Sequence, residues 1–463
     1  MSPARERLAP EDGRILRLES AAIAGHTMKV VVLERPGIDR DALCEHVAER
    51  VPAVPRCRQR LTFAPRGLGP PWWVDDPDFD IDHHVGQVPV AGHADEPALR
   101  EVLARLMERR LDRSRPLWRL DLVGPLAGGG SALVLTAHHC MADGTGILRM
   151  GDALLWGEAP VTTAPVPASP SEPPGTARLL ADSAAERVAG AATAAARAAR
   201  AAGSASVWRS AAREAVRAPR AIHRELAPRA GGSPLAARVG PRRRVAFASA
   251  PLDQLKAIEH AAGAGVTVND VLLAAVAGGV RTWLLHRHGR PGSLRVQVPV
   301  SMHAPDEAAH ALGNRDSSIF VDLPLDDPDP MRRLLRINAE TRERKAQDDP
   351  GTIFVLFDAL SHVPPLYRAA ERLAGSPHVF GLNVSNVPGP REPISVAGTR
   401  VRELRAIAEV GQRHALRVSA LSLAGMLSIG LCADADVVPD LDTLAGGIER
   451  AVAELSGAGG SSR

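Results

Sequence analysis

The heptad at residues 138–144, His-His-Cys-Met-Ala-Asp-Gly, contains the side chains of this chain that are best suited to proton transfer. It follows the apolar run 133–137, whose length is typical of a buried strand, and it precedes residues 144–149, which indicate the start of a helix. A strand that turns into a helix lets a side chain leave the core and face a cavity. A neutral imidazole there can take a proton from a hydroxyl group as the oxygen attacks a carbonyl, and then return it to the leaving group.

The remaining polar residues of the heptad favour supporting roles. Asp143 or Thr145 is expected near the helix cap, and Asp143 can also pair with an arginine and brace the loop. Gly144 leaves room for a backbone turn or a substrate. Two alternatives remain: histidines that only satisfy hydrogen bonds, or a metal held by His138, His139 and Asp143. Adjacent residues at a strand end point to opposite sides, which disfavours the metal.

Composition limits the classes of protein. The chain has 463 residues, of which 45% are hydrophobic and 24% charged, as expected for a soluble globular protein of two domains. A net charge of +3 gives no reason to expect nucleic acid as a partner. The four cysteines have no metal or redox spacing and indicate reduced thiols in the cytoplasm. We see neither a signal peptide nor a run of roughly 18 apolar residues, so any contact with lipid is expected to be peripheral.

Three regions follow from the pattern along the chain: residues 1–157, a linker at 158–240, and residues 241–463. The linker is rich in proline at first and then, over 176–227, in alanine and arginine. That second stretch predicts either a solvated helical crossover or a basic surface that meets anionic lipid.

Strands and helices are predicted to alternate in both outer regions, which is the pattern of an α/β protein. Thr267 is a plausible N-cap, and Asn269 and Asp270 then lie in the first turn of an apolar helix, where such side chains complement free amides. Strands are predicted at 28–33, 119–123, 132–137, 245–249, 294–300, 317–323 and 427–432, and helices at 97–110, 252–262 and 268–286.

A second cluster of possible metal ligands lies at residues 80–84, Asp-Ile-Asp-His-His. Strand alternation would place Asp80, Asp82 and His84 on one face, so a metal is conceivable. We favour a surface strand without a metal.

Several further blocks carry a family resemblance. They are the heptad itself, residues 111–118 with Pro116, Leu117 and Trp118, residues 267–274 with Asn269 and Asp270, and the segments 298–301, 312–315 and 383–390. Together, and in this order, they resemble the bacterial wax ester synthase/acyl-CoA:diacylglycerol acyltransferases. Residues 413–423 depart from the family pattern, which usually has a Ser-His-Gly-like turn there.

The resemblance implies a chloramphenicol-acetyltransferase-like fold, in which two α/β lobes enclose an active-site tunnel. It also implies acyl-CoA as the donor substrate, diacylglycerol or a long-chain alcohol as the acceptor, and no bound cofactor or metal. A peripheral contact with a membrane or lipid droplet fits the same family.

The mechanism implied is direct transfer in a ternary complex. His139 is expected to deprotonate the acceptor hydroxyl and then protonate the departing thiolate, while His138 shapes the loop and Asp143 braces it. Pro116 and Leu117 are expected to pack in the core, and Trp118 either packs or lines the channel. The pair at 269–270 is expected to support the site or the lobe interface, and the donors to the oxyanion cannot be named from the sequence.

Two other classes of function stay open. A condensation-type enzyme would form amides from carrier-protein thioesters, and the heptad is shared with such domains. A non-catalytic relative would bind lipid droplets without chemistry, but it would need no base at His139.

Overall fold

The computed structural model describes residues 6–63, 71–157, 233–263, 265–301, 316–346 and 364–460, and single residues at 181, 185, 223 and 360. Both parts of the predicted linker, the proline-rich segment and most of the alanine/arginine-rich segment, therefore lie outside the described residues. The same holds for the family block at 312–315.

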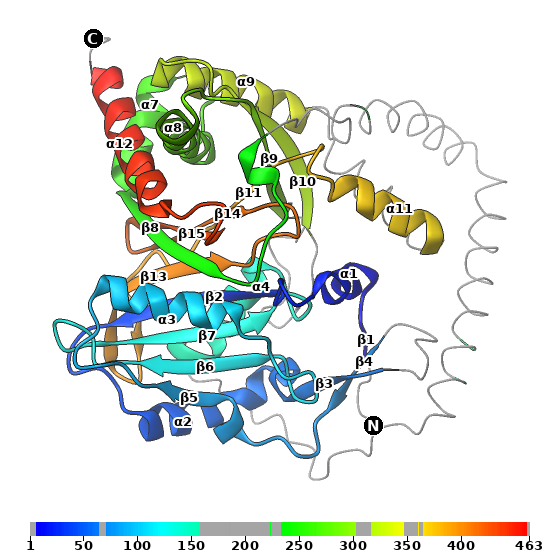
Figure 1. Cartoon of the computed structure of the whole chain (residues 1–463). Coiled ribbons are helices and arrows are strands. Elements are labelled where there is room, and N and C mark those ends of the chain that lie inside the picture. Colours follow the sequence, from blue (N-terminus) through cyan, green and yellow to red (C-terminus); the bar gives the residue numbers. More distant parts are fainter. Residues whose placement is uncertain are drawn as a thin grey trace.

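Two six-stranded mixed sheets form two lobes (Figure 1). The sheet of the first lobe has the order β12-β13-β2-β7-β6-β5, and that of the second lobe has the order β10-β9-β11-β14-β15-β8. The first sheet contains β2 (His26–Leu33), β5 (Val85–Val88), β6 (Trp118–Val123), β7 (Ser131–His138), β12 (Ser395–Val396) and β13 (Thr399–Ala408). The second contains β8 (Arg243–Pro251), β9 (Leu294–Ser301), β10 (Asp316–Leu323), β11 (Leu382–Val387), β14 (Leu416–Leu423) and β15 (Met426–Asp434).

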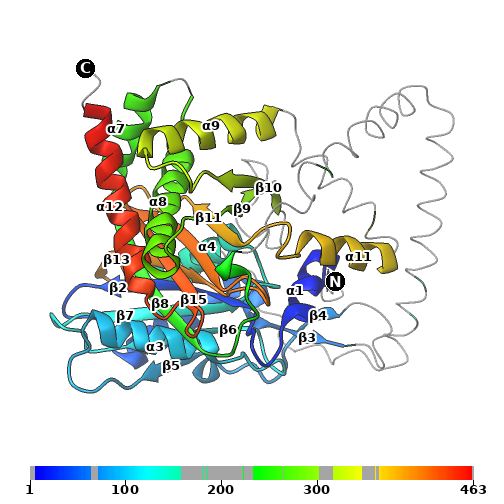
Figure 2. The ribbon, with the colours of Figure 1, turned by 45° about the horizontal axis from the view of Figure 1, so that its top comes forward.

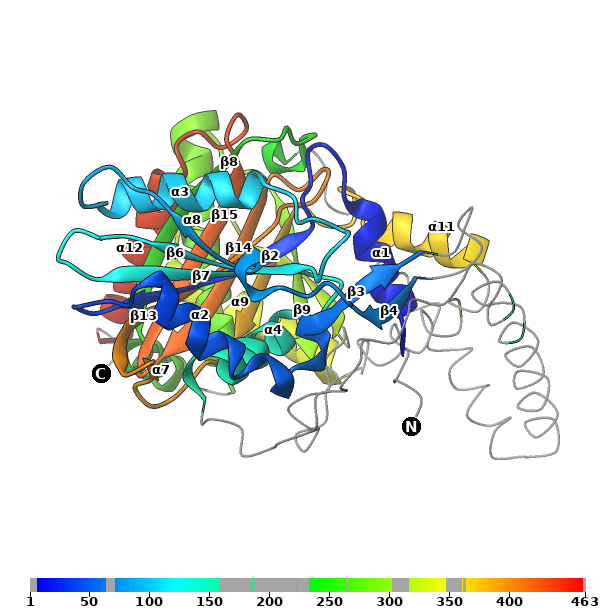
Figure 3. The same ribbon diagram turned by 90° about the horizontal axis from the view of Figure 1, so that it is seen from below.

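Strands β2 and β7 of the first sheet are buried along their whole length, and helices lie on both sides of this sheet (Figure 3). On β2, Val31 belongs to the apolar cluster that contains helix α2 (Arg40–Ala48), whereas Val30 belongs to the cluster on the other face that contains α3 (Glu96–Glu108). A strand with two buried faces has a continuous apolar sequence instead of an alternating one, which explains the apolar residues at 30–33; Lys29 is the charged exception within the strand.

Helices from the C-terminal half of the chain cover the second sheet (Figure 2). They are α7 (Leu252–Ala262), α8 (Val268–His288), α9 (Pro330–Ala346) and α12 (Leu441–Gly460). Helix α8 is long and apolar enough to cross a membrane by length and composition. The prediction that the chain has no apolar run of this length is therefore wrong. Since 72% of the apolar window of α8 is buried inside the lobe, α8 is a core helix.

One segment from the C-terminal part of the chain belongs to the sheet of the first lobe. The prediction assigned 241–463 to the second lobe, but β13 pairs antiparallel with β2, from Val401 opposite Leu33 to Ala408 opposite Thr27. Residues 395–408 therefore complete the sheet of the first lobe. The lobes are further joined by a buried ion pair in which Arg243 Nε lies 2.7 Å from Glu409 Oε1.

Local sequence signals placed most elements correctly. Helix α3 (Glu96–Glu108) lies within two residues of the predicted bounds 97–110 at each end, and α7 covers the predicted residues 252–262. At the start of α8, the Thr267 and Asp270 side chains form a capping box, each accepting a hydrogen bond from the backbone amide of the other residue.

The surface strand predicted at residues 80–84 is wrong. Residues Ile81–His83 form a short 3-10 turn, because the Asp80 carboxylate accepts a hydrogen bond from the amide of Asp82, 3.0 Å away, and caps the turn. Strand alternation does not apply, and His84 is buried instead. Among the described residues no group of three or more possible ligands could hold a metal ion.

Candidate active site

A cavity between the lobes contains the second histidine of the heptad. Strands β2 and β13 form its wall in the first lobe, and β11 and β14 form its wall in the second. The empty space, including the open mouth, is about 610 Å³. Its lining consists of Thr27, Lys29, His139, Gly144, Thr145, Pro299, Ser385, Asn386, Val387, Ala406, Ala408, Arg417, Ser419 and Ala420.

His139 lies just after the last residue of β7. Its backbone amide donates to the carbonyl of Gly25, 2.9 Å away, which fixes the turn against the start of β2. Burial lowers the pKa of His139 to about 4, and the positive charge of Arg417 adds to this, whereas Asp143 opposes it. The imidazole is therefore neutral at physiological pH, which is the form that can accept a proton.

His138 points the other way and is held by the protein. Its Nδ1 accepts a hydrogen bond from the amide of Cys140, 3.1 Å away, which assigns the proton of the neutral ring to Nε2. Nε2 lies 3.5 Å from Glu19 Oε2, and Arg113 holds that same oxygen at 2.5 Å. Burial opposes ionisation of Glu19, but His138 and Arg113 outweigh it and lower its pKa. His138 is thus held by one hydrogen bond at Nδ1 and by the nearby Glu19 carboxylate, and it does not line the cavity.

Asp143 and Gly144 lie where the loop after His139 enters helix α4 (Gly144–Gly151). The Asp143 carboxylate caps α4 by accepting a hydrogen bond from the amide of Gly146, 2.7 Å away. A Cβ on Gly144 would lie 3.2 Å from Cγ2 of Val387 on β11. The space that the glycine leaves is therefore occupied by the other lobe, at the edge of the cavity.

The Pro-Leu-Trp block supports the heptad from outside the cavity. The carbonyl of Leu117 accepts a hydrogen bond from the amide of His138, 2.9 Å away, and the amide of Trp118 donates to the carbonyl of Pro116. The Trp118 indole donates to the carbonyl of Cys57 at 2.8 Å, and its ring stacks on His84 with centroids 4.6 Å apart. Trp118 packs in the core and is not among the residues that line the cavity.

The Asn-Asp pair lies within the second lobe. Asp270 Oδ1 accepts from the Thr341 hydroxyl at 2.7 Å, and its Oδ2 accepts from the side chain of Asn338 at 3.1 Å. Both partners lie on α9, so Asp270 ties α8 to α9. Neither Asn269 nor Asp270 lines the cavity.

Cys140 is not a nucleophile candidate in this arrangement. Its thiol is buried beside the heptad, and burial raises its pKa well above the ordinary value for a thiol. A thiol that stays protonated is a poor nucleophile.

Several polar residues of the cavity were missed by sequence reasoning. Ser385 and Asn386 lie in the block 383–390, which the sequence flagged without a role. Arg417 and Ser419 lie in the segment 413–423, where the family pattern is lost. Lys29 gave one usable signal, since it is a charged residue in an apolar run that was predicted as a strand.

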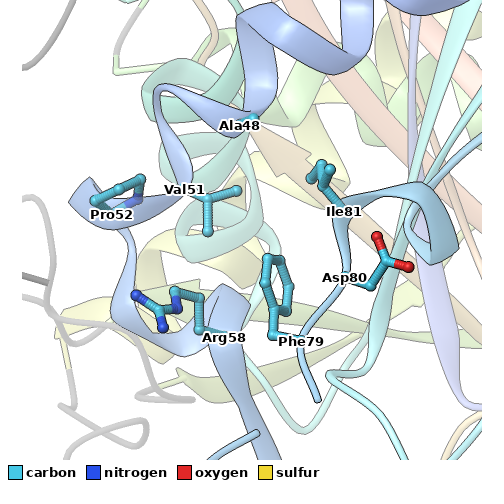
Figure 4. A pocket seen from close by; sticks show the side chains of 7 residues that line it. All are labelled: Ala48, Val51, Pro52, Arg58, Phe79, Asp80 and Ile81. Carbon is cyan, nitrogen blue, oxygen red and sulfur yellow. The ribbon is translucent and has the colours of Figure 1, made fainter. Parts of the chain in front are cut away.

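A second, open pocket lies on the surface of the first lobe (Figure 4). Phe79 is part of its wall, and on its other side the same ring stacks on His84. Asp80, its acidic residue, caps the neighbouring turn. Its residues are Ala48, Val51, Pro52, Arg58, Phe79, Asp80 and Ile81, with no histidine among them, so the interlobe cavity is the better candidate.

The two mixed sheets and the histidine between them define a two-lobed acyltransferase. Residues 8–272 match the wax ester synthase/diacylglycerol acyltransferase catalytic domain and residues 312–456 match the WS/DGAT C-terminal domain, so the chain belongs to this family.

Similar proteins agree with this assignment. The Mycobacterium tuberculosis protein named "Probable diacyglycerol O-acyltransferase tgs1" is 34% identical over 92% of this chain and 90% of its own length. The structure is similar to that of a wax ester synthase/diacylglycerol acyltransferase from Marinobacter aquaeolei VT8, with 24% identity, a TM-score of 0.68 and 98% and 99% of the two chains covered. The first condensation domain of the CDA synthetase has the same fold, with 19% identity, a TM-score of 0.60 and coverage of 98% and 97%.

Proposed function

We propose that this acyltransferase moves a long-chain acyl group from acyl-CoA to the hydroxyl group of diacylglycerol, and that a long-chain alcohol is its alternative acceptor. The observation that carries the proposal is a neutral, partly buried His139 that lines a cavity between the lobes. Membership of the family supplies the class of reaction.

In the proposed reaction, His139 takes the proton of the acceptor hydroxyl while the oxygen attacks the thioester carbon. The tetrahedral intermediate then collapses, the C–S bond breaks, and the thiolate takes the proton from His139. His138, Glu19 and Arg113 act on this step only by holding the turn that carries His139. The scheme requires no metal and no cofactor beyond the acyl-CoA substrate.

Diacylglycerol is the preferred acceptor in this proposal because the similar mycobacterial protein is named for it. The cavity also contains hydroxyl and amide groups from Thr145, Ser385, Asn386 and Ser419, which can bind the ester and hydroxyl oxygens of a glyceride. A plain fatty alcohol offers one oxygen to the same groups.

The test is CoA release from palmitoyl-CoA by purified protein, with dipalmitoylglycerol or hexadecanol as acceptor. We expect acceptor-dependent release, triacylglycerol as the main product, and loss of release in His139→Ala. His286→Ala, at the exposed end of α8, is the matched control and should behave as wild type. Folded wild-type protein that releases CoA with neither acceptor would contradict the proposal.

A condensation-type activity is the competing reaction. The likeness to a condensation domain concerns the fold. Replacing the alcohol by an amine and palmitoyl-CoA by a carrier-protein thioester, with the amide product as readout, separates the two, because only a condensation enzyme would then form an amide. A non-catalytic lipid-binding protein would form neither the ester nor the amide.

We also propose a cytoplasmic enzyme that touches a membrane or lipid droplet at its periphery. Helix α1 (Pro10–Leu18) lies beside α11 (Pro364–Ala374), joined by an ion pair in which Arg17 lies 3.2 Å from Glu371 (Figure 2). Leu18 and Leu373 are exposed on these two helices. Changing both leucines to glutamate should reduce flotation with vesicles that contain diacylglycerol, whereas Met426→Glu, at an exposed site on β15, should not.

A further inference from the structure

A buried lysine lines the same cavity as the base. Three of the 56 basic residues of this chain are lysines, and Lys29 in the middle of β2 is 2% exposed. Within the residues that the structure describes, its ammonium group has no hydrogen-bond or ion-pair partner, although it lines the same cavity as His139. Burying an unpaired ammonium group is costly, so the position indicates a partner that arrives with the ligand.

The charges around Lys29 leave the cavity positive. The titratable and charged groups that act on it are Asp143 at the start of α4, His139 after β7, and Arg417 on β14. Burial lowers the pKa of Lys29 to about 8, Asp143 opposes this shift, and Arg417 adds to it. At neutral pH two cations and a neutral imidazole therefore line the cavity, and the Asp143 carboxylate lies outside its lining.

This charge pattern suits one species of the reaction. The thioester and the alcohol are neutral, but the tetrahedral intermediate carries a negative charge on the former carbonyl oxygen. A fixed positive charge in a site of low dielectric stabilises that intermediate more than the reactants, and this difference is what accelerates a reaction.

We propose that Lys29 is a catalytic residue whose ammonium group donates a hydrogen bond to the oxyanion of the tetrahedral intermediate, while Arg417 strengthens the positive field from the other lobe. The inference rests on the proposed acyl transfer. As the new C–O bond forms, the hydroxyl proton goes to His139 and the π electrons of the carbonyl move to its oxygen. Collapse re-forms the C=O bond, breaks the C–S bond and returns the proton to the thiolate, so Lys29 keeps its own proton throughout.

The test compares Lys29→Met, which keeps the length of the side chain without its charge, with Lys29→Arg and with Lys256→Met. Lys256 is an exposed lysine on α7 and serves as the matched control. Loss of one donor to an oxyanion typically costs on the order of 100-fold to 1000-fold in kcat. We expect such a loss of kcat in Lys29→Met, with a KM for palmitoyl-CoA within about threefold of wild type by that differential-binding argument, partial activity in Lys29→Arg, and wild-type behaviour in Lys256→Met.

The pH profile gives a readout that a purely structural role would not produce. In wild type, kcat should fall as the pH rises through the Lys29 pKa of about 8, and in Lys29→Arg this alkaline limb should move upward. If Lys29→Met fails to fold, the wild-type and arginine profiles still decide the question.

Retention of kcat in folded Lys29→Met, or a rise in KM alone, would overturn the inference while leaving the proposed function intact. No CoA release by wild type with any acceptor would overturn both.

Discussion

Replacing Gly430 by alanine should force the lobes apart. Gly430 lies on β15 in the second sheet, and a Cβ there would lie 1.9 Å from the carbonyl oxygen of Ala406 on β13. Ala406 belongs to the sheet of the first lobe and lines the cavity. A carbon and a carbonyl oxygen need about 3.3 Å, so the two strands must separate by about 1.4 Å.

The loss of stability in Gly430→Ala depends on whether the atoms that the new Cβ meets can move. Overpacking a core costs roughly 1–3 kcal/mol when side chains can shift. Here the obstacle is a backbone carbonyl within a paired strand, so we expect a loss of about 3 kcal/mol or more in the free energy of unfolding. Because Ala406 also lines the cavity, kcat for CoA release should fall as well.

The assay is urea unfolding followed by circular dichroism, with Gly457→Ala as the matched control. Gly457 lies on α12, and a Cβ there meets no atom within 4 Å. The same substitution in a helix should stabilise the protein by roughly 0.5–1 kcal/mol. If Gly430→Ala unfolds at the wild-type urea concentration, the close approach of β15 to β13 does not hold the lobes together as argued.

Three further predictions concern titration and positioning. Since burial and Arg417 lower the pKa of His139 to about 4, kcat/KM should stay level as the pH falls from 7 to 5 and decline near 4; an acid limb near 6.5 would refute this lowered pKa. Burial lowers the pKa of His26 to about 3 and those of His84 and His414 to about 4. Below about pH 6.5 the unfolded chain binds protons that the folded chain does not, so stability should be lost progressively between pH 6.5 and 4 in urea titrations at successive pH values, and a rise would contradict this. Glu19→Leu removes the carboxylate beside His138, so kcat should drop about tenfold or more with KM little changed, whereas unchanged kcat would show that this contact does not position the turn.

Much of the fold was readable because its signals are local. The predicted N-cap of α8 at Thr267 depends on a side chain within three residues of the amide that it binds. The turn at residues 80–84 shows the limit of such reasoning. Alternation suggested a strand there, but a single Asp80 cap was enough to close a 3-10 turn.

The sequence by itself determined the α/β class from its alternating strands and helices, and its family blocks implied the two lobes. It also predicted His139 as the base, because a strand, a histidine pair and a helix start follow one another without interruption. Only the tertiary structure decided what surrounds that base. Lys29, Ser385 and Arg417 come from strands far apart in the chain, and their meeting depends on the pairing of β13 with β2 across the lobes. Long-range strand register is set by the packing of whole sheets, so no local pattern reveals which charges share a cavity.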